Sequence, residues 1–183
     1  MSRFVIPASI DAAPAASRPL LEAVQKQLGS VPNLFRLVAV SPQSLEGYLG
    51  LSGALAGGSL PAPTRERIAL AVAEINGCGY CLSAHTYLGR NLARLDDAEI
   101  AANRSGRSND LKADAAVRFA AEIARLRGHV DASSLQRVRE AGYTDAQLIE
   151  IVLHVALNTW TNYVNEVAKT DVDFPVVEVR RVA

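Results

Sequence analysis

The chain has few residues of several types, and each shortage excludes some classes of protein. Its 183 residues include two cysteines, one methionine and one tryptophan, and aromatic residues make up only 5%. No apolar run approaches the roughly 20 residues that cross a bilayer, so we expect no membrane partner. No segment shows the alternation of apolar and polar residues that is typical of a half-buried strand. These absences leave a helical protein as the first expectation.

An excess of positive charge is also missing. Nineteen Lys and Arg residues balance nineteen Asp and Glu residues, and the pI is near 6.8. Such a chain has no surplus of cations to neutralise phosphate backbones or anionic lipid, so nucleic acid is not an expected partner. The first twenty residues have neither the apolar core of a secretory signal nor the Arg-rich character of an organelle presequence. We therefore expect a cytoplasmic protein.

The sequence does show apolar residues at helical spacing, with capping residues, prolines and glycines where helices would begin and end. This pattern predicts one all-α domain. Residues 1–16 contain Pro7, Pro14 and many small residues, and we expect them to form an extended N-terminal arm. Residues 17–183 form the predicted domain, and its length suffices for a substantial core. The last residues, 170–183, read as a polar turn followed by a short tail with strand propensity.

Capping residues mark several helix starts. Ser41 followed by Pro42 predicts the beginning of one helix. The pairs Asp96 with Glu99 and Thr144 with Gln147 have the spacing of capping boxes. Residues 68–75 are apolar almost all round, which indicates a helix buried at the centre of the domain.

The two cysteines lie three positions apart in the stretch "EINGCGYCLSAH", residues 74–85. In a reducing cytosol such a pair is more often catalytic, redox-sensing or metal-binding than a structural staple. His85 follows Cys81 by four positions, so on a helix Cys78, Cys81 and His85 share one face. A helix dipole can lower a cysteine pKa in the first turn, an imidazole can carry the proton, and the second thiol can resolve a sulfenic acid as a disulfide.

Three other interpretations of the pair are open. Two cysteines three apart can simply fill a core. Cys78, Cys81 and His85 can bind a metal, although structural zinc normally needs four ligands and no third cysteine is present. A thioredoxin-type motif would follow a strand, whereas a helix is predicted before Gly77.

The run "TRERIALAVAEINGCGYCLSAHTYLGR", residues 64–90, resembles the superfamily of AhpD-like alkylhydroperoxidases and carboxymuconolactone decarboxylases. A glutamate stands twelve residues before a Cys-x-x-Cys that is followed by three residues and a histidine. The closing stretch "ALNTWTNYVNEVAKTDVDFP" is similar to the end of the branch called peroxidase-related enzymes. The likeness covers most of residues 30–175, with the redox motif at 66–85.

The resemblance implies an AhpD-like helical bundle that assembles into homo-oligomers. It implies that Cys81 is the peroxidatic cysteine, that Cys78 resolves, and that His85 and Glu66 relay protons. The helix-dipole argument alone favours Cys78 as the attacking thiol, so the two lines of reasoning differ. No organic cofactor and no metal are implied, and an external dithiol must reduce the disulfide.

Several positions depart from the family pattern or compete with it. Tyr80 stands where the better-studied alkylhydroperoxidases often have a second histidine, and a phenol is a poorer proton shuttle at neutral pH. Glu74 is nearer to the cysteines in sequence than Glu66, and it is either a rival acid or an exposed glutamate at a helix edge.

A polar stripe on the last helix has a predicted structural or subunit-contact role, and Trp160 and Tyr163 are expected to be core or interface aromatics. The stripe consists of His154, Asn158, Asn162 and Asn165.

We therefore expect a thiol-dependent peroxidase that reduces hydrogen peroxide or organic hydroperoxides. A lactone decarboxylase is the rival within the superfamily, but it needs no thiol pair. A non-catalytic redox sensor or oligomeric scaffold is the rival from another class, since its cysteines would report oxidation without turnover.

Overall fold

Helix α4 (Ala62–Ile75) lies at the centre of the molecule, because residues 68–73 are buried all round it. It packs against α5 (Gly79–Asn91), α6 (Asp97–Arg104), α7 (Leu111–Leu126) and α9 (Asp145–Ala168). The computed structural model describes residues 2–180. The predicted central helix is thus confirmed. Helix α5, which carries Cys81 and His85, packs directly against it.

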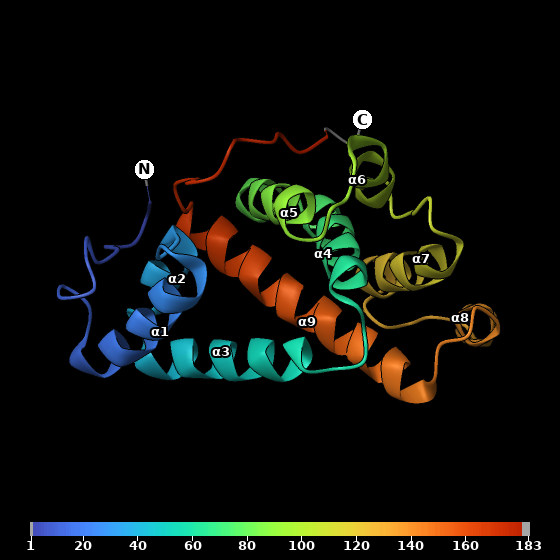
Figure 1. Ribbon diagram of the computed structural model, residues 1–183, viewed down its shortest axis with the longest axis horizontal. Coiled ribbons are helices and arrows are strands. Elements are labelled where there is room, and N and C mark those ends of the chain that lie inside the picture. Colours follow the sequence, from blue (N-terminus) through green and yellow to red (C-terminus); the bar gives the residue numbers. More distant parts are fainter. Residues whose placement is uncertain (1, 181–183) are drawn as a thin grey trace.

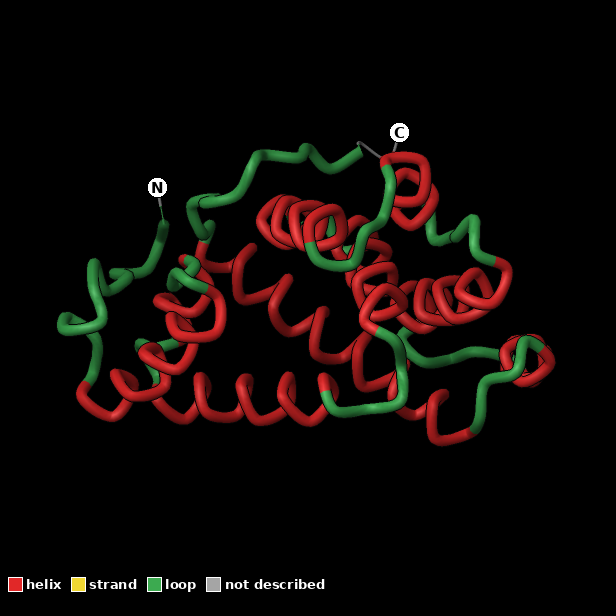
Figure 2. The backbone as a smooth tube through the Cα atoms, viewed as in Figure 1, coloured by secondary structure: helices red, strands yellow, loops and turns green. Residues whose placement is uncertain are grey.

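The remaining helices lie around this centre (Figure 1). The long helix α9 runs diagonally through the molecule, and α3 (Pro42–Ala56) packs along it. Helices α1 (Arg18–Leu28) and α2 (Asn33–Val38) lie at one end, with a 3-10 turn at Ala15–Ser17, and α8 (Ala132–Glu140) lies at the other. Figure 2 shows only helices and loops within residues 2–180, so the all-α prediction is confirmed.

The predicted helix starts are mostly observed. Ser41 caps α3, and Thr144 with Gln147 forms a complete capping box at α9. Asp96 accepts the backbone N–H of Glu99 at 2.7 Å, but the box there is incomplete. The Glu99 carboxylate does not bond back to the N-cap, because it accepts hydrogen bonds from Arg67 and from residues 103, 108 and 109 instead. A charged partner thus outweighed the local capping pattern.

The cysteine pair belongs to one of two apolar clusters in the core. The first contains Leu70 and Ala73 of α4 together with Cys78, Cys81 and Leu82. The second joins α4 to α7, α8 and α9 through residues such as Ile68, Phe119 and Ile151. Since α4 contributes to both clusters, it couples the site rigidly to the rest of the domain.

The two ends of the described chain are extended segments that cover helices. The N-terminal arm packs Ile10 and Ala13 on the first cluster. Residues 169–180 run from the end of α9 across α5 to α6 (Figure 1), where the N–H of Val177 donates to Ser83 Oγ at 2.9 Å. This tail forms no strand up to residue 180, because no neighbouring strand offers a ladder; residues 181–183 and Met1 lie outside the described residues. No helix of the described chain is both long and apolar enough to span a membrane.

Candidate functional site

Cys78 stands at the junction between α4 and α5. Gly77 adopts a left-handed φ of 69°, which turns the chain out of α4 and favours glycine at this position. Cys78 is then the N-cap of α5, and its Sγ accepts the backbone N–H of Cys81 at 3.5 Å. Both cysteines are free thiols with at most 3% exposure. A helix therefore begins directly after Cys78 and carries Cys81 and His85.

Cys81 is surrounded by groups that stabilise a thiolate. The Cys78 thiol donates to its sulfur, and His85 and the amides of Asn162 and Asn165 add to this effect, so that despite burial the pKa of Cys81 falls to about 6. The Asn165 Nδ2 atom lies 3.3 Å from Cys81 Sγ, and Thr161 Oγ1 lies at 4.0 Å. At neutral pH the sulfur of Cys81 therefore carries the negative charge.

The pKa of Cys78 shifts in the opposite direction, upward. Its hydrogen bond to Cys81, followed by burial and by the negative charge of Cys81, raises the pKa of Cys78 far above its ordinary value. The two sulfurs share one proton, and it resides on Cys78 because only Cys81 also has a histidine and two amides beside it. These opposite pKa shifts favour Cys81 as the attacking thiol over Cys78, which the helix dipole alone favours.

His85 and Glu66 are in direct contact beside the cysteines. His85 Nδ1 lies 2.9 Å from Glu66 Oε2, which joins α5 to α4, and both side chains are 22% exposed. Burial alone would lower the pKa of His85, but the Glu66 carboxylate and the Cys81 thiolate raise it. The imidazole lies one turn after Cys81 and retains a proton more readily than an ordinary histidine.

Glu74 and Tyr80 lie outside this pair. Glu74 accepts a 2.6 Å bond from Arg104, and its side chain is only 9% exposed, so the reading as an exposed glutamate is wrong. It also accepts the backbone N–H of Arg180, which holds the C-terminal tail. The Tyr80 hydroxyl accepts the backbone N–H of Leu34 at 3.0 Å. Both side chains hold elements together, and Glu66 is the acid that contacts His85.

The polar stripe of α9 is buried, with exposures from 0% to 6%. In its C-terminal half Asn165 contacts Cys81, and Asn162 accepts a bond from Asn76, whereas the stripe was expected to have a structural or subunit-contact role. At the other end, burial and the nearby Arg65 lower the pKa of His154 to about 4. The sequence signal for the two amides was this stripe on an otherwise apolar helix.

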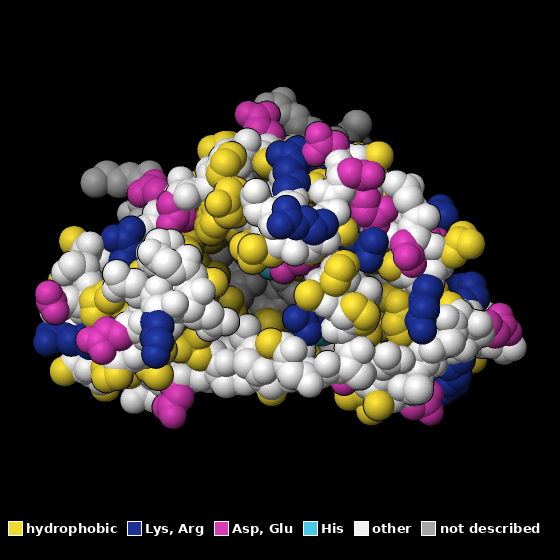
Figure 3. Space-filling view, viewed as in Figure 1, with side chains coloured by type: hydrophobic (Ala, Val, Ile, Leu, Met, Phe, Trp, Pro, Cys, Tyr) yellow, Lys and Arg dark blue, Asp and Glu magenta, His cyan; other side chains and the backbone are white. Residues whose placement is uncertain are grey.

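Figure 3 shows a hollow in the molecular surface over α9, between α5 and α3. These three helices carry Cys81, Asn165 and Tyr48. The Tyr48 ring packs on Trp160 with ring centroids 5.5 Å apart. Trp160 is 37% exposed and Tyr163 is 57% exposed, so Tyr163 is not a core aromatic of the described chain.

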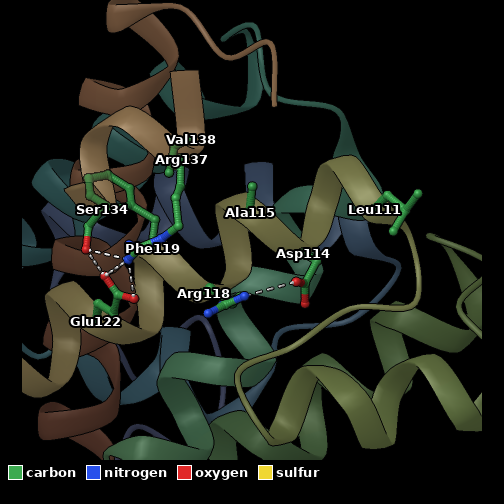
Figure 4. Close-up of a pocket in the computed structure, with 9 residues that line it drawn as sticks. All are labelled: Leu111, Asp114, Ala115, Arg118, Phe119, Glu122, Ser134, Arg137 and Val138. Carbon is green, nitrogen blue, oxygen red and sulfur yellow. Dashed lines mark hydrogen bonds and ion pairs between the residues drawn. The ribbon is translucent and has the colours of Figure 1, made fainter. Parts of the chain in front are cut away.

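Two other cavities lie away from the cysteines. A cavity of about 100 Å³ between α7 and α8 is lined by residues of the segment 111–138 alone (Figure 4). An open groove of about 480 Å³ follows α9 and includes Trp160, Tyr163 and Asn76. Within residues 2–180, no three His, Cys, Asp or Glu side chains are grouped as metal ligands.

Several solved structures have the same fold. A peroxidase-related protein with an alkylhydroperoxidase AhpD core from Ralstonia eutropha JMP134 is 24% identical, with a TM-score of 0.84, and the match covers 94% of this chain and 92% of that one. A peroxidase-related protein from Silicibacter sp. TM1040 is also 24% identical, with a TM-score of 0.81 and coverage of 93% and 91%. The debrominase Bmp8 is 20% identical, with a TM-score of 0.77 and coverage of 93% and 92%.

No curated protein sequence matches the chain. The model of the carboxymuconolactone decarboxylase family matches residues 42–126, which include α4 and the whole motif from Glu66 to His85. The chain is thus similar to this family over residues 42–126, and it shares its fold with the peroxidase-related proteins of the AhpD type.

Proposed function

We propose that the protein is a thiol-dependent peroxidase that reduces hydrogen peroxide or organic hydroperoxides. The observation that carries the proposal is the environment of Cys81, whose pKa of about 6 makes it a thiolate at neutral pH beside a protonated second thiol. A thiolate is the nucleophilic form of cysteine, and this one is buried next to a histidine and a carboxylate. Core packing alone would not require these charged neighbours.

In the first half of the cycle, the Cys81 thiolate attacks the terminal oxygen of the peroxide. A sulfur–oxygen bond forms, the O–O bond breaks, and the leaving oxygen keeps the electron pair. His85 gives this oxygen its proton, while Glu66 stabilises the imidazolium before transfer. The products are a sulfenic acid on Cys81 and an alcohol, or water when hydrogen peroxide is the substrate.

In the second half, Cys78 attacks the sulfenic sulfur. The hydrogen bond to Cys81 and the charge of Cys81 are the main causes, along with burial, that keep Cys78 protonated, and both disappear once Cys81 is oxidised. The thiol then loses its proton to His85, a disulfide forms, and the former sulfenic oxygen leaves as water. An external dithiol reduces the disulfide by exchange and completes the cycle.

The two rivals use these residues differently. A lactone decarboxylase needs acid–base groups, and Glu66 with His85 could supply them, but such chemistry gives no role to a thiolate beside a second thiol. A redox sensor would use both cysteines and would stop after one oxidation. Repeated turnover therefore separates the proposed peroxidase from both alternatives.

The test is peroxide consumption with excess dithiothreitol by wild-type protein, Cys81→Ser and Cys78→Ser. Wild type should turn over many equivalents of peroxide, and Cys81→Ser should lose this activity. In a parallel reaction without dithiothreitol, Cys78→Ser should still consume one equivalent of peroxide per chain but form no internal disulfide. Consumption that is equal in all three proteins would overturn the proposal, and oxidation without turnover in wild type would favour the sensor.

A further inference from the structure

Tyr48 of α3 presents a polar group to the site that the proposed cycle does not use. Its ring packs between Phe35 and Trp160, with centroids 5.5 Å from each and interplanar angles of 48° and 32°. Contacts on both sides fix the position of the ring. The hydroxyl end is the part of the side chain that these contacts leave available.

The Tyr48 hydroxyl has no hydrogen-bond partner among residues 2–180. The ring is half-buried and packs against the apolar cluster that contains Cys78 and Cys81. A phenol in such a place normally finds an acceptor, and one that lacks a protein partner points to a water or a ligand.

The Tyr48 ring packs on Trp160, which precedes Thr161, and Thr161 Oγ1 lies 4.0 Å from Cys81 Sγ. Burial raises the pKa of Tyr48 well above its ordinary value, and the negative charges of Cys81 and Glu66 raise it further. The phenol therefore stays neutral at neutral pH and can only donate toward an anion. It comes from α3, whereas Cys81 is on α5 and Glu66 on α4, and the hollow in Figure 3 lies between α3 and α5.

We propose that Tyr48 is a further catalytic residue, whose hydroxyl donates a hydrogen bond to the leaving oxygen of the peroxide as the O–O bond breaks. This inference rests on the proposed peroxidase function. Tyr48 keeps its own proton throughout: the leaving oxygen takes the bond's electron pair, the phenol stabilises that charge, and His85 then protonates it. A preorganised donor at a developing oxyanion is an effective way to lower a barrier.

The test compares Tyr48→Phe with wild type and with the matched variant Tyr163→Phe. Tyr163 is 57% exposed on α9, so its hydroxyl can be removed without changing the site. The rate of sulfenic acid formation on Cys81 is measured with hydrogen peroxide and with cumene hydroperoxide, above the pKa of the thiol. The rate of alkylation of Cys81 by iodoacetamide is measured in parallel, because iodide leaves without needing a hydrogen bond.

Tyr48→Phe should oxidise roughly tenfold more slowly with both peroxides, which is less than the usual cost of one lost oxyanion donor because His85 still protonates the leaving oxygen. Its alkylation rate should match wild type, and Tyr163→Phe should be normal in both reactions. An unchanged peroxide rate, or equal losses in oxidation and alkylation, would overturn the role of Tyr48 alone. A wild-type protein that consumes no peroxide would overturn the proposed function, and this inference with it.

Discussion

His85 on α5 and Glu66 on α4 are nineteen residues apart in the chain, yet His85 Nδ1 lies 2.9 Å from Glu66 Oε2. The contact crosses the break at Gly77, where φ of 69° ends the continuity between the two helices. It gives the imidazole a charged partner and orients its other nitrogen away from Glu66. The protonation state of Cys81 therefore depends on a carboxylate that does not touch it.

Glu66→Gln should uncouple this pair without breaking it, because the amide oxygen can still accept a bond from His85. Removing the charge should lower the pKa of His85, since Glu66 is a cause of its elevation. The pKa of Cys81 should rise in turn, because the charge of His85 helps to lower it. We expect peroxide reduction at pH 7 to slow about tenfold, which is less than the full contribution of acid–base catalysis because the imidazole of His85 remains. Rates measured across pH check both shifts.

Glu74→Gln is the matched control on the same helix. Glu74 pairs with Arg104 at 2.6 Å and is nearly buried, so its loss should lower the free energy of unfolding by roughly 3–5 kcal/mol. The pH dependence of the peroxide reaction should stay that of wild type. A shifted pH profile in Glu74→Gln with an unshifted one in Glu66→Gln would assign the acid to Glu74 instead.

Cys78→Ala should make Cys81 a weaker acid. The hydrogen bond from the Cys78 thiol is the largest cause of the lowered pKa of Cys81, so its removal should move that pKa upward from about 6. Cys78→Ser retains a hydroxyl donor, and its shift should be smaller. The pH midpoint of iodoacetamide alkylation reports the pKa directly, because each variant has one remaining cysteine. An unchanged midpoint in Cys78→Ala would mean that the thiols do not share a proton.

How far the sequence predicts the site depends on the distance along the chain. Helical spacing alone brings Cys78, Cys81 and His85 together, because all three lie at the start of one helix. Glu66 needed the family resemblance, since the turn at Gly77 lies between the two helices and spacing cannot be carried through it. Asn165 is 84 residues from Cys81, and local periodicity marks it only as polar on an apolar helix.

The fold shows the same division. Caps such as Ser41 and the Thr144–Gln147 box depend on three or four neighbouring residues, and they were predictable. The Glu99 carboxylate was not, because Arg67 on another helix competes for it. The direction of the Tyr80 hydroxyl likewise depends on Leu34, which no local pattern identifies.

Tyr80→Phe should destabilise the protein without slowing its chemistry. The substitution leaves the buried N–H of Leu34 without its acceptor, which costs about 1–3 kcal/mol. Tyr87→Phe is matched, because both rings contact Phe174 with centroids 5.9 Å apart and Tyr87 is 44% exposed. Urea unfolding should separate the two variants. A slower oxidation of Cys81 in Tyr80→Phe alone would give this hydroxyl a part in the reaction.

His154 should make the fold sensitive to acid. Burial and Arg65 lower its folded pKa to about 4, while an unfolded histidine titrates near 6.5. Below pH 6.5 His154 binds a proton in the unfolded chain but stays neutral in the folded protein. Its contribution to the free energy of unfolding is therefore complete above pH 6.5 and is lost as the pH falls from 6.5 to about 4. The shift corresponds to about 3 kcal/mol for a side chain that is 5% exposed.

The measurement is the free energy of unfolding of wild type and His154→Gln across pH 4–8. The difference between the two proteins isolates this group, because all other titrating residues are shared. The wild-type advantage should shrink steadily from pH 6.5 to 4, and the two curves should run parallel between pH 7 and 8. Curves that remain parallel down to pH 4 would show that His154 is protonated in the folded protein, and its buried Nε2 would then need an acceptor.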